Sequence, residues 1–313
     1  MKLEQIHIPV LLKEVLEYLD LKPGKIVFDG TLGGAGHTVE IFKAIAPTGK
    51  LIAVDHDSLA ISTASSLFKD CRNIFFSKGN FADVKRIIKS FGINRLDGVF
   101  LDIGLSSIQI DKSGRGFSYI RDEKLDMRMG EDNPLSAFKV VNEYSEQKLK
   151  EIFFKFGEEK YSLRIARNIT LSRKDKPVET TGQLNKIIEN SIPAKEKFSK
   201  RGHPSKRIFQ AIRIEVNKEL ENLTRAIDEG FEVLNKGGRM VIISYHSLED
   251  RIVKNKFIGF SGKCTCPPGL PVCICGAKKQ AEILTKRIIT PSDEEISNNK
   301  RAASAKLRAI EKL

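Results

Sequence analysis

Short apolar runs alternate with segments of helical spacing over the first hundred residues of the chain. Each apolar run is bounded by an acid or a turn residue, which predicts a buried strand. The predicted strands are residues 25–29, 51–55, 73–77 and 98–102. The predicted helices are residues 9–20, 36–46, 58–68 and a segment that ends near residue 92. Because helices separate successive strands, we predict an α/β fold with a parallel, doubly wound sheet covered on both faces.

The alternation stops after residue 112. Residues 113–214 hold no apolar run that predicts a buried strand, but they show helical patterns at Glu146–Phe156 and Leu163–Leu171. We therefore expect an inserted helical domain at residues 113–214. The sheet-forming domain then consists of residues 1–112 and 215–313.

The sheet is expected to resume after the insertion. A long helical pattern begins near Ile208 and runs to Gly237-Gly238, where we predict the end of the helix. A strand is predicted directly afterwards at residues 240–244, and a last strand at residues 283–290. The segment from Thr290 to Asp293 has the signals of a helix start.

The net charge indicates what kind of partner the protein binds. The formal charge is +13, and an excess of this size favours a polyanion, with nucleic acid ahead of a membrane. Residues 151–218 alone carry a net +8. Phe198, His203 and Phe209 lie among these charges, which favours phosphate contacts and base stacking over a merely solvated basic surface. The candidate RNA-binding residues are Lys200, Arg201, Lys206 and Arg207.

The apolar runs and the cysteines indicate a compartment. No run approaches the roughly 18 residues of a membrane span. The first apolar segment carries Glu4, Lys13 and Glu14, unlike a signal peptide. Five cysteines, an odd number, do not resemble a secreted disulfide framework. We expect a cytoplasmic protein with no membrane partner.

Four of the cysteines form two close pairs, Cys264 with Cys266 and Cys273 with Cys275. Four thiolates suit zinc, but the usual sites separate paired ligands by two to four residues, and these pairs are tighter. A loop of reduced cysteines near the RNA face is the competing interpretation. The metal content therefore stays open.

The turn after the first strand predicts a nucleoside-type cofactor. Asp29 closes the strand, and glycines follow it up to Gly36. A dinucleotide site would need a third glycine after Gly34-Ala35-Gly36, where this chain has Val39. An acid ahead of the glycines favours S-adenosylmethionine over NAD, either by accepting from the amino end of the methionyl group or by orienting the loop. Asp55 ends the second strand and is placed to accept from two ribose hydroxyls.

Further candidates follow the later strands. Phe81 either lies on the adenine face or is a core aromatic at a helix start. Asp102 ends the fourth strand, at the carboxyl edge where open α/β sheets bind ligands. Tyr245 and His246 reach the same edge, where they either line a base pocket or belong to a helix cap at Ser247.

Several segments together resemble the bacterial ribosomal RNA small subunit methyltransferase H family, also called MraW. They are, in order, HIPVLLKEVL, DGTLGGAGH, VDHD, LDIGLSS, FQAIRIEVN, SYHSLEDR and ITPSDEE with the tail RAASAKLRAIEK. The resemblance runs almost end to end. It implies a class I, Rossmann-like methyltransferase domain interrupted by a helical domain. It also implies methyl transfer from S-adenosylmethionine to N4 of a cytidine in the decoding region of 16S ribosomal RNA.

The resemblance also implies the cofactor contacts. These are Ala35, Gly36, His37, Asp55, Phe81, Asp102 and Gln109. One stretch departs from the family: where two basic residues often flank an Ile-His-Pro-Ala run, this chain reads Arg201-Gly202-His203-Pro204-Ser205. The departure lies in the expected RNA face.

The residues agree with chemistry at an exocyclic amine. Attack at C5 of cytosine needs a cysteine nucleophile, usually in a Pro-Cys pair, and this chain has only the reverse order at Cys266-Pro267. An amine needs an acceptor for its proton, and our hypothesis assigns that catalytic role to Asp102 or a carbonyl of its turn. A role of Asp102 toward the cofactor alone is the alternative.

Two other functions stay open. DNA amino-methyltransferases carry an acid or amide followed by two prolines and an aromatic residue, and here Asp102 is kept without the prolines. A non-catalytic ribosomal RNA assembly factor is the second alternative. Neither the oligomeric state nor the choice between free RNA and an assembled small subunit follows from the sequence.

Overall fold

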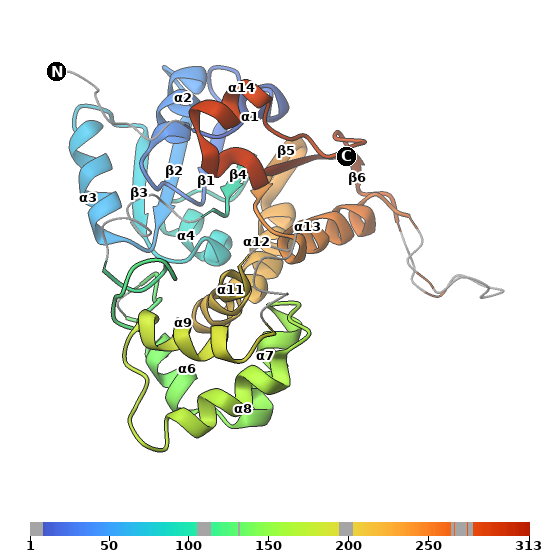
Figure 1. The fold of residues 1–313 in the computed structure, drawn as a ribbon. Coiled ribbons are helices and arrows are strands. Elements are labelled where there is room, and N and C mark those ends of the chain that lie inside the picture. The colour runs from blue at the N-terminus through green and yellow to red at the C-terminus, as the bar shows by residue number, and fades with distance from the viewer. Residues whose placement is uncertain are drawn as a thin grey trace. The chain divides into compact units, whose positions relative to one another are not determined.

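The computed structural model describes residues 9–104, 114–130, 132–193, 203–263, 266, 274 and 278–313 (Figure 1). The chain divides into two compact units. The sheet unit comprises Met1–Gly104 and Leu220–Leu313, and the helical unit comprises Leu105–Glu219. The boundaries that we expected were residues 112 and 214. Within the described ranges, no helix is both long enough and apolar enough to cross a membrane.

The sheet unit contains a seven-stranded sheet in the order β3-β2-β1-β4-β5-β7-β6. Its first five strands are parallel, and β7 runs antiparallel to both β5 and β6. The connection reverses direction between β1 and β4, and such a switch point is where open α/β sheets bind ligands. The strands are β1 (Ile26–Asp29), β2 (Lys50–Asp55), β3 (Ile74–Lys78), β4 (Leu96–Asp102), β5 (Leu234–Ser244), β6 (Ala281–Ile283) and β7 (Lys306–Lys312).

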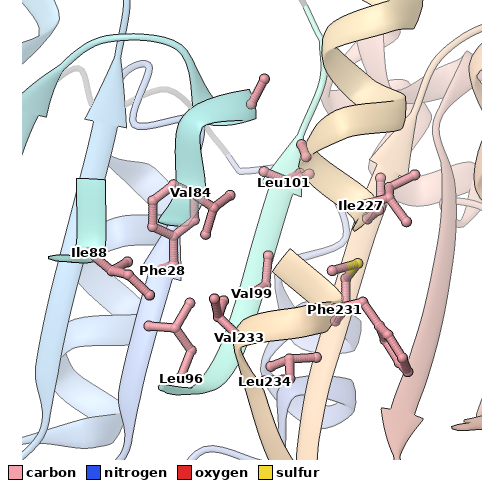
Figure 2. Packing of buried hydrophobic residues seen from close by; sticks show 14 of the residues in the cluster. Phe28, Val84, Ile88, Leu96, Val99, Leu101, Ile227, Phe231, Val233 and Leu234 are labelled. Carbon is pink, nitrogen blue, oxygen red and sulfur yellow. The ribbon is translucent and has the colours of Figure 1, made fainter. Parts of the chain in front are cut away.

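Helices cover both faces of this sheet. Successive residues of a strand point to opposite faces, so an apolar strand needs a cover on each face. Val27 of β1 packs in one cluster with Ile41, whereas Phe28 packs in another with Ile88 and Ile227. Figure 2 shows the second cluster around β1 and β4. Burying each such side chain contributes about 1.5–3 kcal/mol. The first face is covered by α1 (Leu12–Leu19), α2 (Gly36–Ile45) and α3 (Ser58–Leu67), and the second by α4 (Val84–Ser90), α12 (Glu219–Val233) and α13 (Ser247–Phe260).

The single long helix expected after Ile208 is wrong, because the structure has two helices there. The first, α11 (Pro204–Asn217), ends at Lys218, whose φ of 51° lies in the left-handed region. The side chain of Asn217 donates a hydrogen bond to the carbonyl oxygen of Met127. This tertiary contact holds the chain where it leaves the helix, and helical periodicity alone does not reveal it.

The glycines at 237 and 238 do not end a helix, which corrects a second expectation. Helix α12 already ends at Val233, and β5 begins at Leu234 rather than at residue 240. Gly237, with a φ of +74°, and Gly238 lie inside the strand. The register of β5 against β4 is irregular at this point. The glycines therefore allow an irregularity in the strand.

The last strand predicted at residues 283–290 is also wrong. Strand β6 ends at Ile283, and beyond it Ile289 forms an isolated bridge to Leu307. The last strand is β7, which enters the sheet between β5 and β6. Leu307 and Ile310 of β7 are buried, but charged residues separate its apolar positions and hide the pattern in the sequence.

Two predicted helix starts are confirmed by their caps. Helix α14 (Asp293–Asn298) begins after Ser292, whose side chain accepts a hydrogen bond from the Glu295 N–H. Helix α3 begins after Asp57, whose carboxylate accepts from the Leu59 N–H. Side-chain oxygens at these positions satisfy N–H groups that lack a partner within the helix.

The helical unit has its own apolar core. Leu149, Phe153 and Ile165 are fully buried in this core. Its described residues contain no strand, apart from a bridge between Lys124 and Thr180. The helices in the described part of this unit are α6 (Ala137–Glu143), α7 (Glu146–Lys155), α8 (Ser162–Ser172), α9 (Thr181–Asn190) and α11.

Replacing Gly30 by alanine should destabilise the sheet unit. A Cβ atom at Gly30 would lie 2.8 Å from the Cβ of Phe81 and closer still to the side chain of Leu101. Overpacking of this kind costs about 1–3 kcal/mol. The matched control is Gly259→Ala in α13, where nothing lies within 4 Å of the added atom. Urea unfolding of both variants measures the difference, and equal stabilities would contradict the tight packing at Gly30.

Candidate functional site

A buried carboxylate holds the turn that follows β1. Asp29 is fully buried, and its Oδ1 accepts a hydrogen bond from the Thr31 N–H at 3.1 Å. Its Oδ2 accepts from the hydroxyl of Thr38 in the first turns of α2 at 2.6 Å. Burial raises the pKa of the Asp29 carboxyl. Because both oxygens bond to the glycine turn and its helix, Asp29 orients the loop, which was one of the two roles considered for it.

A second carboxylate holds the middle of the same turn. Oδ2 of Asp55 accepts from the Gly33 N–H at 2.8 Å, and Oδ1 accepts from the Asp57 N–H at 2.8 Å. Burial raises the pKa of Asp55 as well. The turn needs this support, since Gly33 and Ala35 have φ values of 48° and 62°. A carboxylate offers about four lone pairs, so Asp55 retains capacity for two further donors.

The turn leads into α2, which presents unpaired backbone donors. Ala35 precedes this helix and provides no side-chain cap. The first N–H groups of a helix have no partner within it, and with the helix dipole they favour electron-rich ligand groups. Gly36 and His37 thus bring backbone N–H groups to the carboxyl edge of β1, whereas the Ala35 N–H already donates to the carbonyl oxygen of Leu32 at 2.7 Å.

The side chain of His37 makes its own polar contacts. Its Nε2 lies 2.9 Å from the carbonyl oxygen of Val10, and its Nδ1 lies 3.8 Å from Oδ2 of Asp102. The ring rests against Phe100, with centroids 4.7 Å apart. The imidazole therefore belongs to a buried polar network, while the backbone of His37 belongs to the helix start.

Asp102 is joined to two neighbouring strand ends. Its N–H donates to Oγ1 of Thr31 at 2.7 Å, and its carboxylate interacts electrostatically with the hydroxyl of Tyr245. Burial and the charge of Asp102 raise the pKa of Tyr245, so the phenol stays protonated. The Tyr245 ring lies so close to Gly104 that a Cβ there would be 2.6 Å from Cε2. This glycine is therefore required by packing.

Phe81 lies beside the glycine turn, at the start of the short 3₁₀ helix η1 (Phe81–Asp83). Asn80 caps that helix by accepting from the Ala82 N–H. Phe81 packs against the buried cluster under the sheet and keeps part of its surface exposed. Both roles considered for this residue are compatible with its place, and its contact with adenine stays a prediction.

Comparison with known proteins decides the family. A model of the MraW methylase family matches residues 4–313. The chain is 49% identical over 307 residues to "Ribosomal RNA small subunit methyltransferase H" of Clostridium botulinum (strain Loch Maree / Type A3), covering 98% of this chain and 99% of that one. It is 46% identical over 308 residues to the protein of the same name from Finegoldia magna, covering 98% of both.

The chain belongs to the MraW methylase family. The resemblance inferred from its motifs is thereby confirmed, as is the mostly parallel, Rossmann-like fold of a methylase.

In this MraW methylase, the carboxyl edge of the sheet brings together most of the residues named for the cofactor. Five of them, from Ala35 to Phe81, lie around the turn after β1, and Asp102 closes the edge. Gln109 lies outside the described residues. The sequence analysis did not identify Thr31 or Thr38, although a hydroxyl residue in the glycine turn and another in the first turn of α2 were a usable signal.

Two of the four RNA-binding candidates lie in the described part of the chain. Lys206 is exposed in the first turn of α11, whereas Arg207 forms an ion pair with the buried carboxylate of Glu159. Lys200 and Arg201 lie outside the described residues, as do Cys264, Cys273 and Cys275. The RNA contacts therefore stay predictions, and both interpretations of the cysteines, a zinc site and a loop of reduced thiols, stay open.

His246 and Tyr245 take separate positions in this family member. His246 caps α13, because its Nδ1 accepts from the Glu249 N–H at 3.4 Å while the Glu249 side chain bonds back to the cap. The cap is therefore one residue earlier than the Ser247 considered from the sequence. Tyr245 instead reaches Asp102.

Asp29→Asn should make the folded protein relatively more stable as pH rises. In the folded state the pKa of Asp29 is raised above its ordinary 3.8. As pH rises, the unfolded chain therefore ionises this carboxyl before the folded chain does, and the wild type loses stability. Asparagine does not titrate, and it can accept from the Thr31 N–H while donating to the Thr38 hydroxyl. Urea unfolding from below pH 3.8 to neutral measures the stability difference. A difference that is constant over this range would contradict the assignment.

Proposed function

We propose that this chain is an S-adenosylmethionine-dependent methyltransferase that methylates N4 of a cytidine in the decoding region of 16S ribosomal RNA. The observation that carries the proposal is the second carboxylate, Asp55, at the end of β2, bonded to the glycine turn and able to accept further donors. The family and the names of its relatives give the same reaction class and the same RNA.

The residues present fit a sulfonium nucleoside. Asp55 is placed for ribose hydroxyls, and the helix start at Gly36 and His37 offers N–H groups to the carboxylate of a methionyl group. Asp102 supplies negative charge at the switch point of the sheet. When bound, S-adenosylmethionine supplies a methyl group on a positively charged sulfur.

The target is an amine rather than a ring carbon. Attack at C5 needs a thiolate beside the cofactor. Cys71 precedes β3 and packs in the core, so it lies toward the amino end of the strands. Asp102 is the acceptor placed at the carboxyl edge, and we assign to it the proton acceptance that an amine requires. The target base must leave its stack to reach such a group.

We further propose that the helical unit recognises RNA and that the protein acts on small ribosomal subunits in the cytoplasm. The charge supports this, because most of the net +13 lies in the inserted segment. Lys206 supports it structurally, as an exposed cation in the first turn of α11 that forms no ion pair with the described residues.

Asp55→Asn should abolish most methyl transfer by weakening cofactor binding. Hydrogen bonds to a charged group contribute about 1.5–3 kcal/mol, so affinity for S-adenosylhomocysteine should fall roughly 10- to 100-fold. The matched control is Asp57→Asn, because Asp57 caps α3 and an asparagine can still cap. Calorimetry gives the affinities, and radiolabelled methyl transfer to small subunits, naked ribosomal RNA and duplex DNA gives the substrate.

Transfer to duplex DNA, with no transfer to RNA, would contradict the proposed function and favour a DNA amino-methyltransferase. Binding without transfer to any of the three substrates would favour the assembly-factor alternative. Equal affinities of both variants would remove Asp55 from the cofactor site.

Lys206→Ala should weaken RNA binding without changing stability. Loss of one phosphate contact should lower the slope of log affinity against log salt by about 1. The control is Lys69→Ala, an exposed lysine of the sheet unit with the same change in charge. Filter binding of the variants to a 16S RNA fragment at several salt concentrations measures both effects. Equal slopes for wild type and Lys206→Ala would contradict a phosphate contact.

A further inference from the structure

The contacts of His37 determine which of its ring nitrogens carries hydrogen. Nε2 lies 2.9 Å from the carbonyl oxygen of Val10, and a carbonyl oxygen only accepts. Nε2 must therefore be the donor in the neutral ring. Neutral imidazole has a single N–H, so Nδ1 carries a lone pair. That lone pair faces Oδ2 of Asp102 at 3.8 Å.

Two acceptors thus lie 3.8 Å apart, with the imidazole buried and the Asp102 side chain 20% exposed. His37 is 8% exposed, and Val10, whose carbonyl it binds, is 2% exposed. A carboxylate and a lone pair have no hydrogen between them, so this pair can take up one proton, and the two atoms must then approach from 3.8 Å to hydrogen-bond distance. The pair is also held in place, since Phe100 packs on the ring and the Asp102 N–H bonds to Thr31.

We propose that Asp102 and His37 together take up the proton released by the target amine, with Asp102 as the catalytic acceptor and His37 as the positioning residue that receives the proton from it. This inference rests on the proposed function. When the amine nitrogen forms its bond to the methyl carbon, the carbon–sulfur bond breaks and its electron pair stays on sulfur. The nitrogen then loses one proton to Asp102, which passes it to Nδ1 of His37. The products are a carboxylate and an imidazolium ion side by side.

This arrangement conserves the charge of the site. The positive charge that leaves the sulfur ends on His37, next to the negative charge of Asp102. An ion pair in a buried site is favourable only when both partners are present. Asp102 without His37 would have to keep the proton itself or return it.

Other ionisable groups face the pair from the surrounding elements. Asp29 of β1 interacts electrostatically with both His37 and Asp102. Glu249 of α13 and Glu295 of α14 act on Tyr245. The negative charges of Asp29 and Asp102 lie beside the imidazole, and a protonated ring has no nitrogen left that can accept. Activity should therefore fall toward low pH, where His37 already holds a proton and its acceptor is filled.

The variant His37→Gln tests the proposal. Glutamine can still donate an amide N–H toward the Val10 carbonyl, but it offers no nitrogen that takes up a proton. We expect kcat to fall by roughly 10²-fold, in the range of general-base effects, and the loss of activity toward low pH to disappear. The KM for S-adenosylmethionine and the melting temperature should stay close to those of the wild type.

A measurement without cofactor or turnover tests the same pair. Nitrogen-15 spectra of the imidazole rings should place the hydrogen of His37 on Nε2, with the signal identified by its absence in His37→Gln among the five histidines. In Asp102→Asn, the nitrogen-15 signal of Nδ1 should move, because an amide replaces the carboxylate 3.8 Å away. This readout remains informative even when a variant loses activity for other reasons.

Three results would overturn the inference. They are a hydrogen on Nδ1 in the neutral ring, wild-type kcat with an unchanged pH profile in His37→Gln, and weakened cofactor binding with normal kcat at saturation. A wild-type protein that transfers no methyl group would instead overturn the proposed function, and the nitrogen-15 spectra would still decide the state of His37.

Discussion

The site depends on how the turn after β1 is tied to the ends of three parallel strands. Asp29 bonds to the turn from β1, Asp55 bonds to Gly33 from β2, and Thr31 accepts from the Asp102 N–H in β4. Each of these hydrogen bonds joins a side chain to a backbone N–H, so the turn cannot shift without breaking at least one of them. The strand ends therefore determine where a ligand finds donors and acceptors.

This construction places negative charge where an ordinary protein interior avoids it. Burial raises the pKa of Asp29 and of Asp55, so their ionised forms are costly in the folded state. Hydrogen bonds from the turn offset part of that cost. A positively charged ligand at the same edge would offset more, which is consistent with the cofactor of a methylase. His37 and Asp102 extend the network toward the acceptor that an amine substrate requires.

Much of this arrangement was predictable from the sequence. Strands β1 to β4 begin and end within two residues of their predicted bounds, because acids and glycines follow their apolar runs directly. Asp29, Asp55 and Asp102 were therefore placed correctly at one edge. The break at Lys218 and the place of β7 were not predictable, since they depend on tertiary contacts and on a strand whose apolar positions are separated by charges. The contact of Tyr245 with Asp102 joins residues far apart in the chain.

The most direct test of the account is a crystal structure of the protein with S-adenosylhomocysteine. The account predicts that both ribose hydroxyls lie within hydrogen-bond distance of the Asp55 carboxylate, and that the homocysteine carboxylate meets the N–H groups at the start of α2. It also predicts that the bonds of Asp29 and Thr31 to the turn are unchanged. A nucleoside bound away from the carboxyl ends of β1 and β2, or a turn that rearranges to release Asp55, would contradict it.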